Sequence, residues 1–208
     1  MTAGYHAAML KNLPPVTRAL LLASIAAYLI QYFTGNLLPG LFALWPAANP
    51  RFQPWQLITY AFLHSGTTHL LFNMLALYMF GAPLEQWFGT RRFSAYYFVC
   101  VVVAAAVQLA VTAAANVNAP TLGASGGIFG LLLAFAWYFP RQRIMLLIPP
   151  IPMPAWLFVL LYGLLELVLG VTGNMSDVAH FAHLGGMLGG AAMILFWRAT
   201  DHPRGRRP

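Results

Sequence analysis

The sequence predicts an all-α integral membrane protein with six transmembrane helices. Of its 208 residues, 60% are hydrophobic and only 7% are charged, whereas about a quarter of the residues in a soluble domain are charged. Apolar segments recur along the whole chain, and the longer ones suit a bilayer core of about 30 Å. Basic residues gather in the connections between these segments, as they do in membrane proteins. We therefore expect one multi-span membrane domain and no separate soluble one.

The membrane domain is expected to cover residues 17–197, after a short cytoplasmic segment at 1–16 and before a basic cytoplasmic tail at 198–208. The first apolar run resembles a signal peptide, but further spans follow it and no convincing cleavage site is evident. Residues 35–65 are rich in proline and aromatic residues, and we expect this connection to lie in the membrane interface. The six spans are expected at about 18–33, 67–80, 93–114, 124–139, 155–171 and 178–197.

The basic residues set the expected orientation, with both termini in the cytoplasm. In this orientation ten of the eleven basic residues fall inside and only Arg51 falls outside. The same distribution argues against nucleic acid as the partner of a chain with net charge +7. The single cysteine, Cys100, allows no intramolecular disulfide, and we expect it to be a small packing residue. The ten basic residues expected on the cytoplasmic side are Lys11, Arg18, Arg91, Arg92, Arg141, Arg143, Arg198, Arg204, Arg206 and Arg207.

Polar residues inside the spans are costly and indicate function by default. Ser125 is near the start of the fourth span, His183 near the start of the sixth, and His69 and Asn73 early in the second. These three spans run in the same direction, so the four residues should lie at similar depth, close to the external surface. Because His69 and Asn73 are four residues apart, they share one helix face.

Glycines provide for a close approach of the fourth and sixth spans. Small residues four apart let helix backbones pack tightly, which would bring Ser125 within hydrogen-bond reach of His183. A serine hydroxyl is a poor nucleophile unless an adjacent base takes its proton. His69, Asn73 and the helix-start amide of Ser125 would then surround an oxyanion. The glycines expected to face one another are Gly126, Gly127 and Gly130 on the fourth span and Gly185, Gly186, Gly189 and Gly190 on the sixth.

Three separated motifs resemble those of the rhomboid family of intramembrane serine proteases. They are His64-x4-His69-x3-Asn73, Gly123-Ala124-Ser125-Gly126 and Ala182-His183-Leu184-Gly185-Gly186. The resemblance covers the order of the spans over about 17–197 and implies a rhomboid-like bundle. It implies Ser125 as the nucleophile, His183 as the general base, and His69 and Asn73 as oxyanion-site residues.

Two positions depart from the pattern of that family. Phe129 stands where the family often has a tyrosine that packs against the histidine, so the ring is retained without its hydroxyl. The first loop often carries a Trp-Arg pair, whereas this chain has Trp55-Gln56. The second departure puts the contacts of the loop in question, but not the catalytic pair.

Other polar residues suggest alternative sites. His180 and His183, with His64 and His69, could suggest a metal site, but a zinc protease more typically offers His-Glu-x-x-His, so we expect no metal and no cofactor. Asp177 lies six residues before His183, about 240° around a helix, and is expected to cap the sixth helix instead of completing a triad. For His64 a structural hydrogen-bonding role and a functional one stay equally open.

Two glutamates are interpreted as structural. We expect Glu85, with Arg91 and Arg92, to form a solvated turn that orients the chain. Glu166 lies within the fifth span, where a carboxylate is expensive. No sequence spacing ties it to His183, so we expect a structural or gating role, and Glu166→Gln should lower activity less than about tenfold.

Together these features predict an intramembrane serine endopeptidase that cleaves peptide bonds in or next to transmembrane segments by a Ser-His dyad. The implied partners are transmembrane protein substrates and the lipid bilayer. The expected location is the bacterial cytoplasmic (inner) membrane, with the active site opening toward the external, periplasmic side. The alternatives are an inactive rhomboid-like protein that binds membrane clients, and a transporter or metal-binding bundle.

Overall fold

The computed structural model of the chain describes residues 13–145, 151–172 and 179–200. Within these residues the protein is mostly helical, as the sequence predicts. One departure from an all-α fold is a small antiparallel pair of strands, β1 (Arg143–Met145) and β2 (Pro152–Pro154), in the connection after the fourth predicted span. Three parts of the chain lie outside the described residues: the N-terminal segment before residue 13, Asp177 with its predicted capping role, and the tail after residue 200.

The helices follow the predicted spans, with one interruption. The second predicted span is a continuous helical run from Thr67 to Phe88 whose middle turn, η2, is a π-helix. By length and composition, α2, α7, α9 and α10 are long and apolar enough to cross a membrane, whereas α8 has only 14 residues. The helices with these bounds are α2 (Pro15–Thr34), α5 (Thr67–Ala76), η2 (Leu77–Gly81), α6 (Ala82–Phe88), α7 (Thr90–Ala114), α8 (Ser125–Tyr138), α9 (Ala155–Thr172) and α10 (His180–Thr200).

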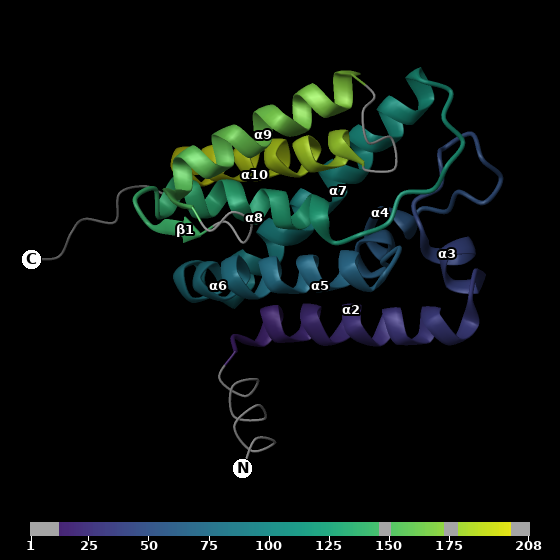
Figure 1. Cartoon of the computed structure of the whole chain (residues 1–208), viewed down its shortest axis with the longest axis horizontal. Helices are drawn as coiled ribbons and strands as arrows, with labels where there is room; N and C mark the ends of the chain where they lie inside the picture. Colours follow the sequence, from purple (N-terminus) through teal and green to yellow (C-terminus); the bar gives the residue numbers. More distant parts are fainter. Residues whose placement is uncertain (1–12, 146–150, 173–178, 201–208) are drawn as a thin grey trace, which may run out of the picture.

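The helices lie side by side and alternate in direction (Figure 1). α5, α8 and α10 all begin at the end of the bundle where the short helices α3 (Leu37–Phe42) and α4 (Gln56–Thr59) lie. α2 and α9 begin at the opposite end, near β1. The second, fourth and sixth predicted spans therefore run in one direction, and their first turns form one layer.

The centre of the bundle is formed by α7, α8 and α10, which pack extensively on one another. Tyr96, Tyr97 and Cys100 of α7 are fully buried there, so the expectation that Cys100 is a packing residue is confirmed. By contrast, α9 lies at the outside and exposes an apolar face that includes Leu160, Leu164 and Val168. Such a face suits lipid and not water.

Close packing of α8 on α10 depends on two of the four predicted glycines of α10. A Cβ at Gly186 would overlap the carbonyl of Gly126. One at Gly190 would meet the hydroxyl of Tyr96 on α7 first and would lie 3.3 Å from Cα of Gly130, whereas one at Gly127 of α8 would meet Tyr97 and Val101 of α7 and not α10. The other two, Gly185 and Gly189, face Val107 and Val103 of α7 instead. The prediction that all four face α8 is therefore wrong, because successive glycines at this spacing lie on two sides of the helix.

The connection between α2 and α5 is folded against the outer end of the bundle. A backbone bridge joins Leu44 to Thr121, with two N–H···O bonds of 2.9 Å. Gln56 is completely buried, and its amide nitrogen donates to the carbonyls of Leu41 at 3.1 Å and Arg51 at 2.8 Å. The glutamine that replaces an arginine in the family pattern thus ties this loop together.

Glu85 does not form the solvated turn that the sequence suggested. It is 2% exposed and accepts hydrogen bonds from the backbone N–H groups of Val16 at 3.0 Å and Thr17 at 2.7 Å. The N–H groups of the first turn of α2 have no acceptor within the helix, and a carboxylate is favourable at that position. Thr90 also donates to Glu85, at 3.2 Å. The residue therefore joins the start of α2 to the start of α7.

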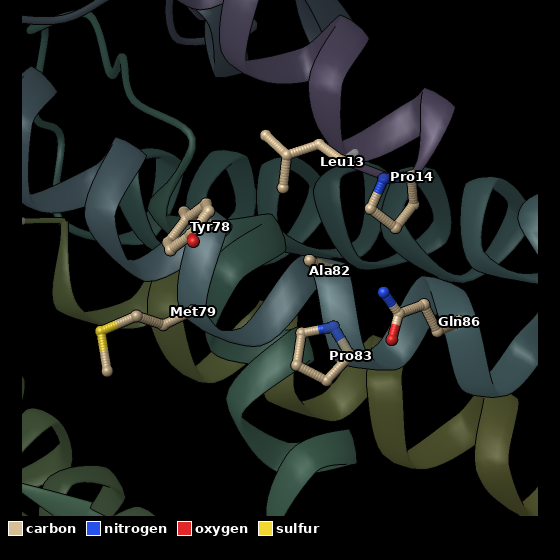
Figure 2. A pocket seen from close by; sticks show the side chains of 7 residues that line it. All are labelled: Leu13, Pro14, Tyr78, Met79, Ala82, Pro83 and Gln86. Carbon is tan, nitrogen blue, oxygen red and sulfur yellow. The ribbon is translucent and has the colours of Figure 1, made fainter. Parts of the chain in front are cut away.

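Aromatic and basic side chains meet at the end of the bundle opposite α3 and α4. The guanidinium groups of Arg92 and Arg198 lie 5.5 Å and 5.6 Å from the ring centres of Trp197 and Trp137. Tryptophan rings paired with arginines at one end of a helix bundle suit the interface between membrane and water. A pocket near this end lies between the start of α2 and the η2–α6 segment, where Leu13, Tyr78 and Pro83 line it (Figure 2). None of its lining residues belongs to the predicted site.

Candidate active site

Ser125 is the first residue of α8, and the segment before it is held in place by backbone hydrogen bonds. Beyond the bridge at Thr121, the N–H of Gly123 donates to the carbonyl of Tyr60 at 3.0 Å. Gly123 has φ +131°, a conformation that side-chain-bearing residues rarely adopt. The turn therefore needs glycine, and it presents Ser125 partly exposed at the start of the helix.

His183 lies in the first turn of α10, beside Ser125. Its Nε2 is 2.8 Å from Oγ of Ser125, which is within the range of an O–H···N hydrogen bond. Gly186 is one turn further along α10 and Gly126 directly follows the serine, so the close contact of these glycines sets the distance between the two helices at the site. The structure thus brings together the predicted nucleophile and base.

The imidazole of His183 is fixed by stacking as well as by hydrogen bonds. The ring of Phe129 lies parallel to it, with ring centres 4.2 Å apart and an angle of 6° between the planes. Phe129 also contacts the ring of Tyr162, with ring centres 4.9 Å apart. Phenylalanine therefore supplies the packing surface for the histidine without a hydroxyl of its own.

His69, in the first turn of α5, lies at the edge of the same site. A Cβ built at Gly123 would be 2.9 Å from Nε2 of His69 and 3.6 Å from Oγ of Ser125. On the other side of the ring, Nδ1 accepts a hydrogen bond from the backbone N–H of Ser65 at 3.4 Å. Because a backbone N–H can only donate, this bond favours the neutral tautomer with its proton on Nε2, and the hydroxyl of Ser65, 2.9 Å from Nδ1, can donate to the same nitrogen.

Asn73 lies one turn after His69 on the same face of α5. It is 6% exposed, and its amide nitrogen donates to the carbonyl of His69 at 2.9 Å. Since an amide nitrogen carries two hydrogens, one N–H remains beyond this bond. All four predicted residues are thus found in the first two turns of α5, α8 and α10.

The structure adds a residue that the sequence interpretation had set apart from the site. Glu166 of α9 is 3% exposed, and its Oε2 lies 2.9 Å from Nδ1 of His183 and 2.6 Å from Nδ1 of His180. The expectation that Glu166 has no tie to His183 is therefore wrong. Depth along the bundle was the missed signal, because Glu166 is six residues before the end of α9 and His183 is three after the start of α10.

The same three residues offer one ligand atom each within 4.8 Å of one another, which is compatible with a metal site. Their contacts are those of hydrogen bonds, however. Ligand atoms around a tetrahedral zinc ion, each at 2.0–2.1 Å from the metal, are about 3.3 Å apart. At 2.6 Å and 2.9 Å the carboxylate oxygen is too close to both nitrogens for such an ion to sit between them. The geometry favours hydrogen bonding over metal binding.

His64 is the remaining histidine of the second-span motif, and it is fully buried behind His69. The two rings meet edge to face, with centres 5.1 Å apart. Neither ring nitrogen of His64 has a hydrogen-bond partner among the described residues. Its backbone carbonyl accepts a bond of 2.8 Å from Gln31 of α2. His64 therefore supports His69 by packing and does not reach Ser125 through any hydrogen bond in the described part of the chain.

Comparison with known proteins gives a consistent family assignment. The Rhomboid domain family matches residues 51–199. The chain is 32% identical over 152 residues to the mitochondrial Rhomboid protein 1 of Saccharomyces cerevisiae, which covers 71% of this chain and 43% of that protein. It is 31% identical over 136 residues to the rhomboid protease GluP of Bacillus subtilis, covering 65% of this chain and 24% of GluP. It is 25% identical over 194 residues to the rhomboid protease GlpG of Yersinia pestis, covering 91% of this chain and 65% of GlpG. The chain thus spans between about a quarter and two thirds of the length of these relatives.

Proposed function

Because the chain belongs to the rhomboid family, we propose that this membrane protein is an intramembrane serine endopeptidase. Its substrates would be proteins with transmembrane segments, cut in or next to those segments. The observation that carries the proposal is the 2.8 Å contact between Oγ of Ser125 and Nε2 of His183. A packing residue would not need a base at this distance, whereas a serine nucleophile does.

The reaction follows from this contact. Oγ of Ser125 attacks the carbonyl carbon of the scissile bond while its proton passes to Nε2 of His183. The tetrahedral intermediate collapses when His183 gives this proton to the leaving amine, which leaves an acyl-enzyme on Ser125. Water then attacks the ester with His183 again as the base, and the serine is restored.

The surroundings of Gly123 support an oxyanion site. The negative oxygen of the intermediate needs donors that are already in position. Nε2–H of His69 faces the space beside Gly123, and the second amide hydrogen of Asn73 and the backbone N–H of Ser125 are further donors. The start of α8 adds the partial positive charge of a helix N-terminus. We propose that His69 and Asn73 serve in this role.

The proposed setting is a six-span domain over residues 17–197 in a bacterial cytoplasmic membrane, with both termini inside. The alternating directions of the helices support six spans, although two of the six helical segments are short or interrupted. In this orientation the layer that holds Ser125 and His183 opens to the periplasmic side. Matches to the bacterial proteases GluP and GlpG support a bacterial membrane, and the yeast relative is mitochondrial by name.

Covalent labelling tests the proposal directly. The detergent-solubilised protein is incubated with a fluorophosphonate probe, and cleavage of a panel of transmembrane-segment reporters is followed in parallel. Wild type should label and cut, Ser125→Ala should do neither, and His183→Ala should lose about 10²–10⁴-fold in rate because nothing takes the proton. A folded wild type that neither labels nor cuts would make the chain an inactive binder of membrane clients.

A further inference from the structure

Glu166 is a carboxylate in an otherwise apolar helix with much of its surface exposed. Its neighbours Leu165 and Leu167 are 49% and 45% exposed, whereas Glu166 is 3% exposed and points toward α10. A carboxylate at this depth is costly unless it is paired and hydrogen-bonded. Its Oε2 lies within hydrogen-bond distance of Nδ1 of His180 and Nδ1 of His183.

This contact sets the tautomer of His183. An ionised carboxylate can only accept hydrogen bonds, so Nδ1 of His183 must carry a hydrogen to donate to Glu166. The neutral ring then has its lone pair on Nε2, the atom 2.8 Å from Oγ of Ser125. In this tautomer Ser125 donates its hydroxyl hydrogen to Nε2, which is the arrangement that a general base requires.

We propose that Glu166 is a positioning residue that completes a Ser125–His183–Glu166 triad. This inference rests on the proposed protease function and deepens it. When Ser125 attacks the scissile carbonyl, its proton moves to Nε2 and His183 becomes an imidazolium. Glu166 stabilises that cation through the 2.9 Å hydrogen bond and keeps its own negative charge. The proton then leaves with the amine product, so the carboxylate is unchanged over the cycle.

His180 holds the carboxylate from the other side. Its ring lies nearly perpendicular to that of His183, with centres 6.4 Å apart, and its Nδ1 is 2.6 Å from the same Oε2. Both histidines lie on α10, three residues apart, so they share the face that meets α9. The carboxylate oxygen therefore cannot rotate away from His183 without breaking its shorter bond to His180. Two donors on one oxygen fix its position relative to the base.

Glu166→Gln is the informative substitution because it preserves size and changes the hydrogen bonding. An amide has one accepting oxygen and a nitrogen that donates. If the nitrogen faces His183, the ring turns to the tautomer with hydrogen on Nε2 and no longer accepts the proton of Ser125. In a soluble serine protease the equivalent change of the triad carboxylate lowers kcat by about 10⁴-fold. Here we expect kcat to fall at least about 10²-fold with KM within about threefold, in place of the loss below tenfold expected from sequence.

The test compares Glu166→Gln with Glu85→Gln. Glu85 is a second buried carboxylate, at the other end of the bundle, whose partners among the described residues are backbone N–H groups and threonine hydroxyls. Reporter cleavage, fluorophosphonate labelling rate and thermal unfolding in detergent are measured for both. We expect Glu85→Gln to lower the unfolding temperature and leave kcat of the folded fraction within about threefold. Glu166→Gln should lower kcat, although its unfolding temperature should be equal to or above that of Glu85→Gln.

A double-substitution comparison separates positioning from a general structural effect. If Glu166 acts only through His183, then adding Glu166→Gln to His183→Ala should not reduce the residual labelling rate further, because residues of one triad are non-additive. A further loss of tenfold or more in that background would overturn the proposal, and so would an Glu166→Gln protein as active as Glu85→Gln. Wild-type activity that a chelator abolishes and zinc restores would also overturn it, in favour of a metal site. A wild type that does not label at all would instead refute the proposed function, on which the triad depends.

Discussion

Gly186 is the position where one methyl group should separate the two halves of the active site. A Cβ at this residue would overlap the carbonyl oxygen of Gly126 and lie 2.7 Å from its carbonyl carbon. Both atoms belong to the backbone of α8, so no side-chain rotation relieves the overlap. To reach ordinary van der Waals contact, α8 and α10 would have to part by about 1 Å or more.

The consequence for catalysis follows from the position of Gly186 along α10. His183 is one turn before it, and Ser125 directly precedes Gly126, so the displacement is transmitted to the 2.8 Å contact between Oγ and Nε2. A movement of about 1 Å takes this pair beyond hydrogen-bond range. Misplacement of this size costs about 10²-fold in rate, and overpacking of the interface costs about 1–3 kcal/mol of stability.

Gly163→Ala is the matched control, because it adds the same methyl group to a membrane helix. A Cβ there would meet the end of Met187, at 3.3 Å from Cε and 3.6 Å from Sδ. This flexible side chain can move aside, and the alanine gains up to about 1 kcal/mol of helix propensity. Labelling rate and unfolding temperature of both variants are measured in one detergent. Gly186→Ala should label about 10²-fold more slowly and unfold earlier, and equal behaviour of the two variants would refute the role of the glycine contact.

Three further predictions concern orientation, the oxyanion site and substrate choice. A reporter that is active only in the cytoplasm should work when inserted between Arg141 and Arg143, and a periplasmic-only reporter active there would invert the topology. Asn73→Ala should lower kcat toward the lower end of about 10²–10³-fold, because His69 supplies a second donor, and substrate binding measured with the Ser125→Ala background should not change. Replacing glycine or proline near the cut site of a reporter with leucine should slow its cleavage, since unwinding its helix then costs more, and unchanged rates would contradict an unwinding requirement.

The catalytic pair can be predicted from the sequence because the geometry of the pair depends on regular, local features. Ser125 and His183 each lie in the first turn of a helix that begins at the same end of the bundle. Their depth therefore follows from the order and direction of the spans, and the glycines supply the close approach. Where a residue's role depends on which neighbouring helix it faces, sequence spacing alone does not predict that role. Gly185 and Gly189 face α7 for this reason, although they belong to the same pattern as Gly186.

The partners of both buried glutamates escape prediction from the sequence for a common physical reason. The free-energy cost of burying a charged residue is offset by hydrogen-bond partners, and here these partners come from other helices. Neither sequence distance nor periodicity identifies them. Glu85 meets the first turn of α2 at a separation of 68 residues from Thr17, and Glu166 meets α10 at a separation of 17 residues from His183. The sequence does show that each carboxylate is costly to bury and at which depth of its span it lies. A carboxylate that an apolar helix retains at the depth of the catalytic base needs donors there, and the donors at that depth are His180, at 2.6 Å, and the base His183, at 2.9 Å. The rule that makes Glu166 expensive thus also directs it to His183, and a search by depth would find this contact where a search by spacing does not.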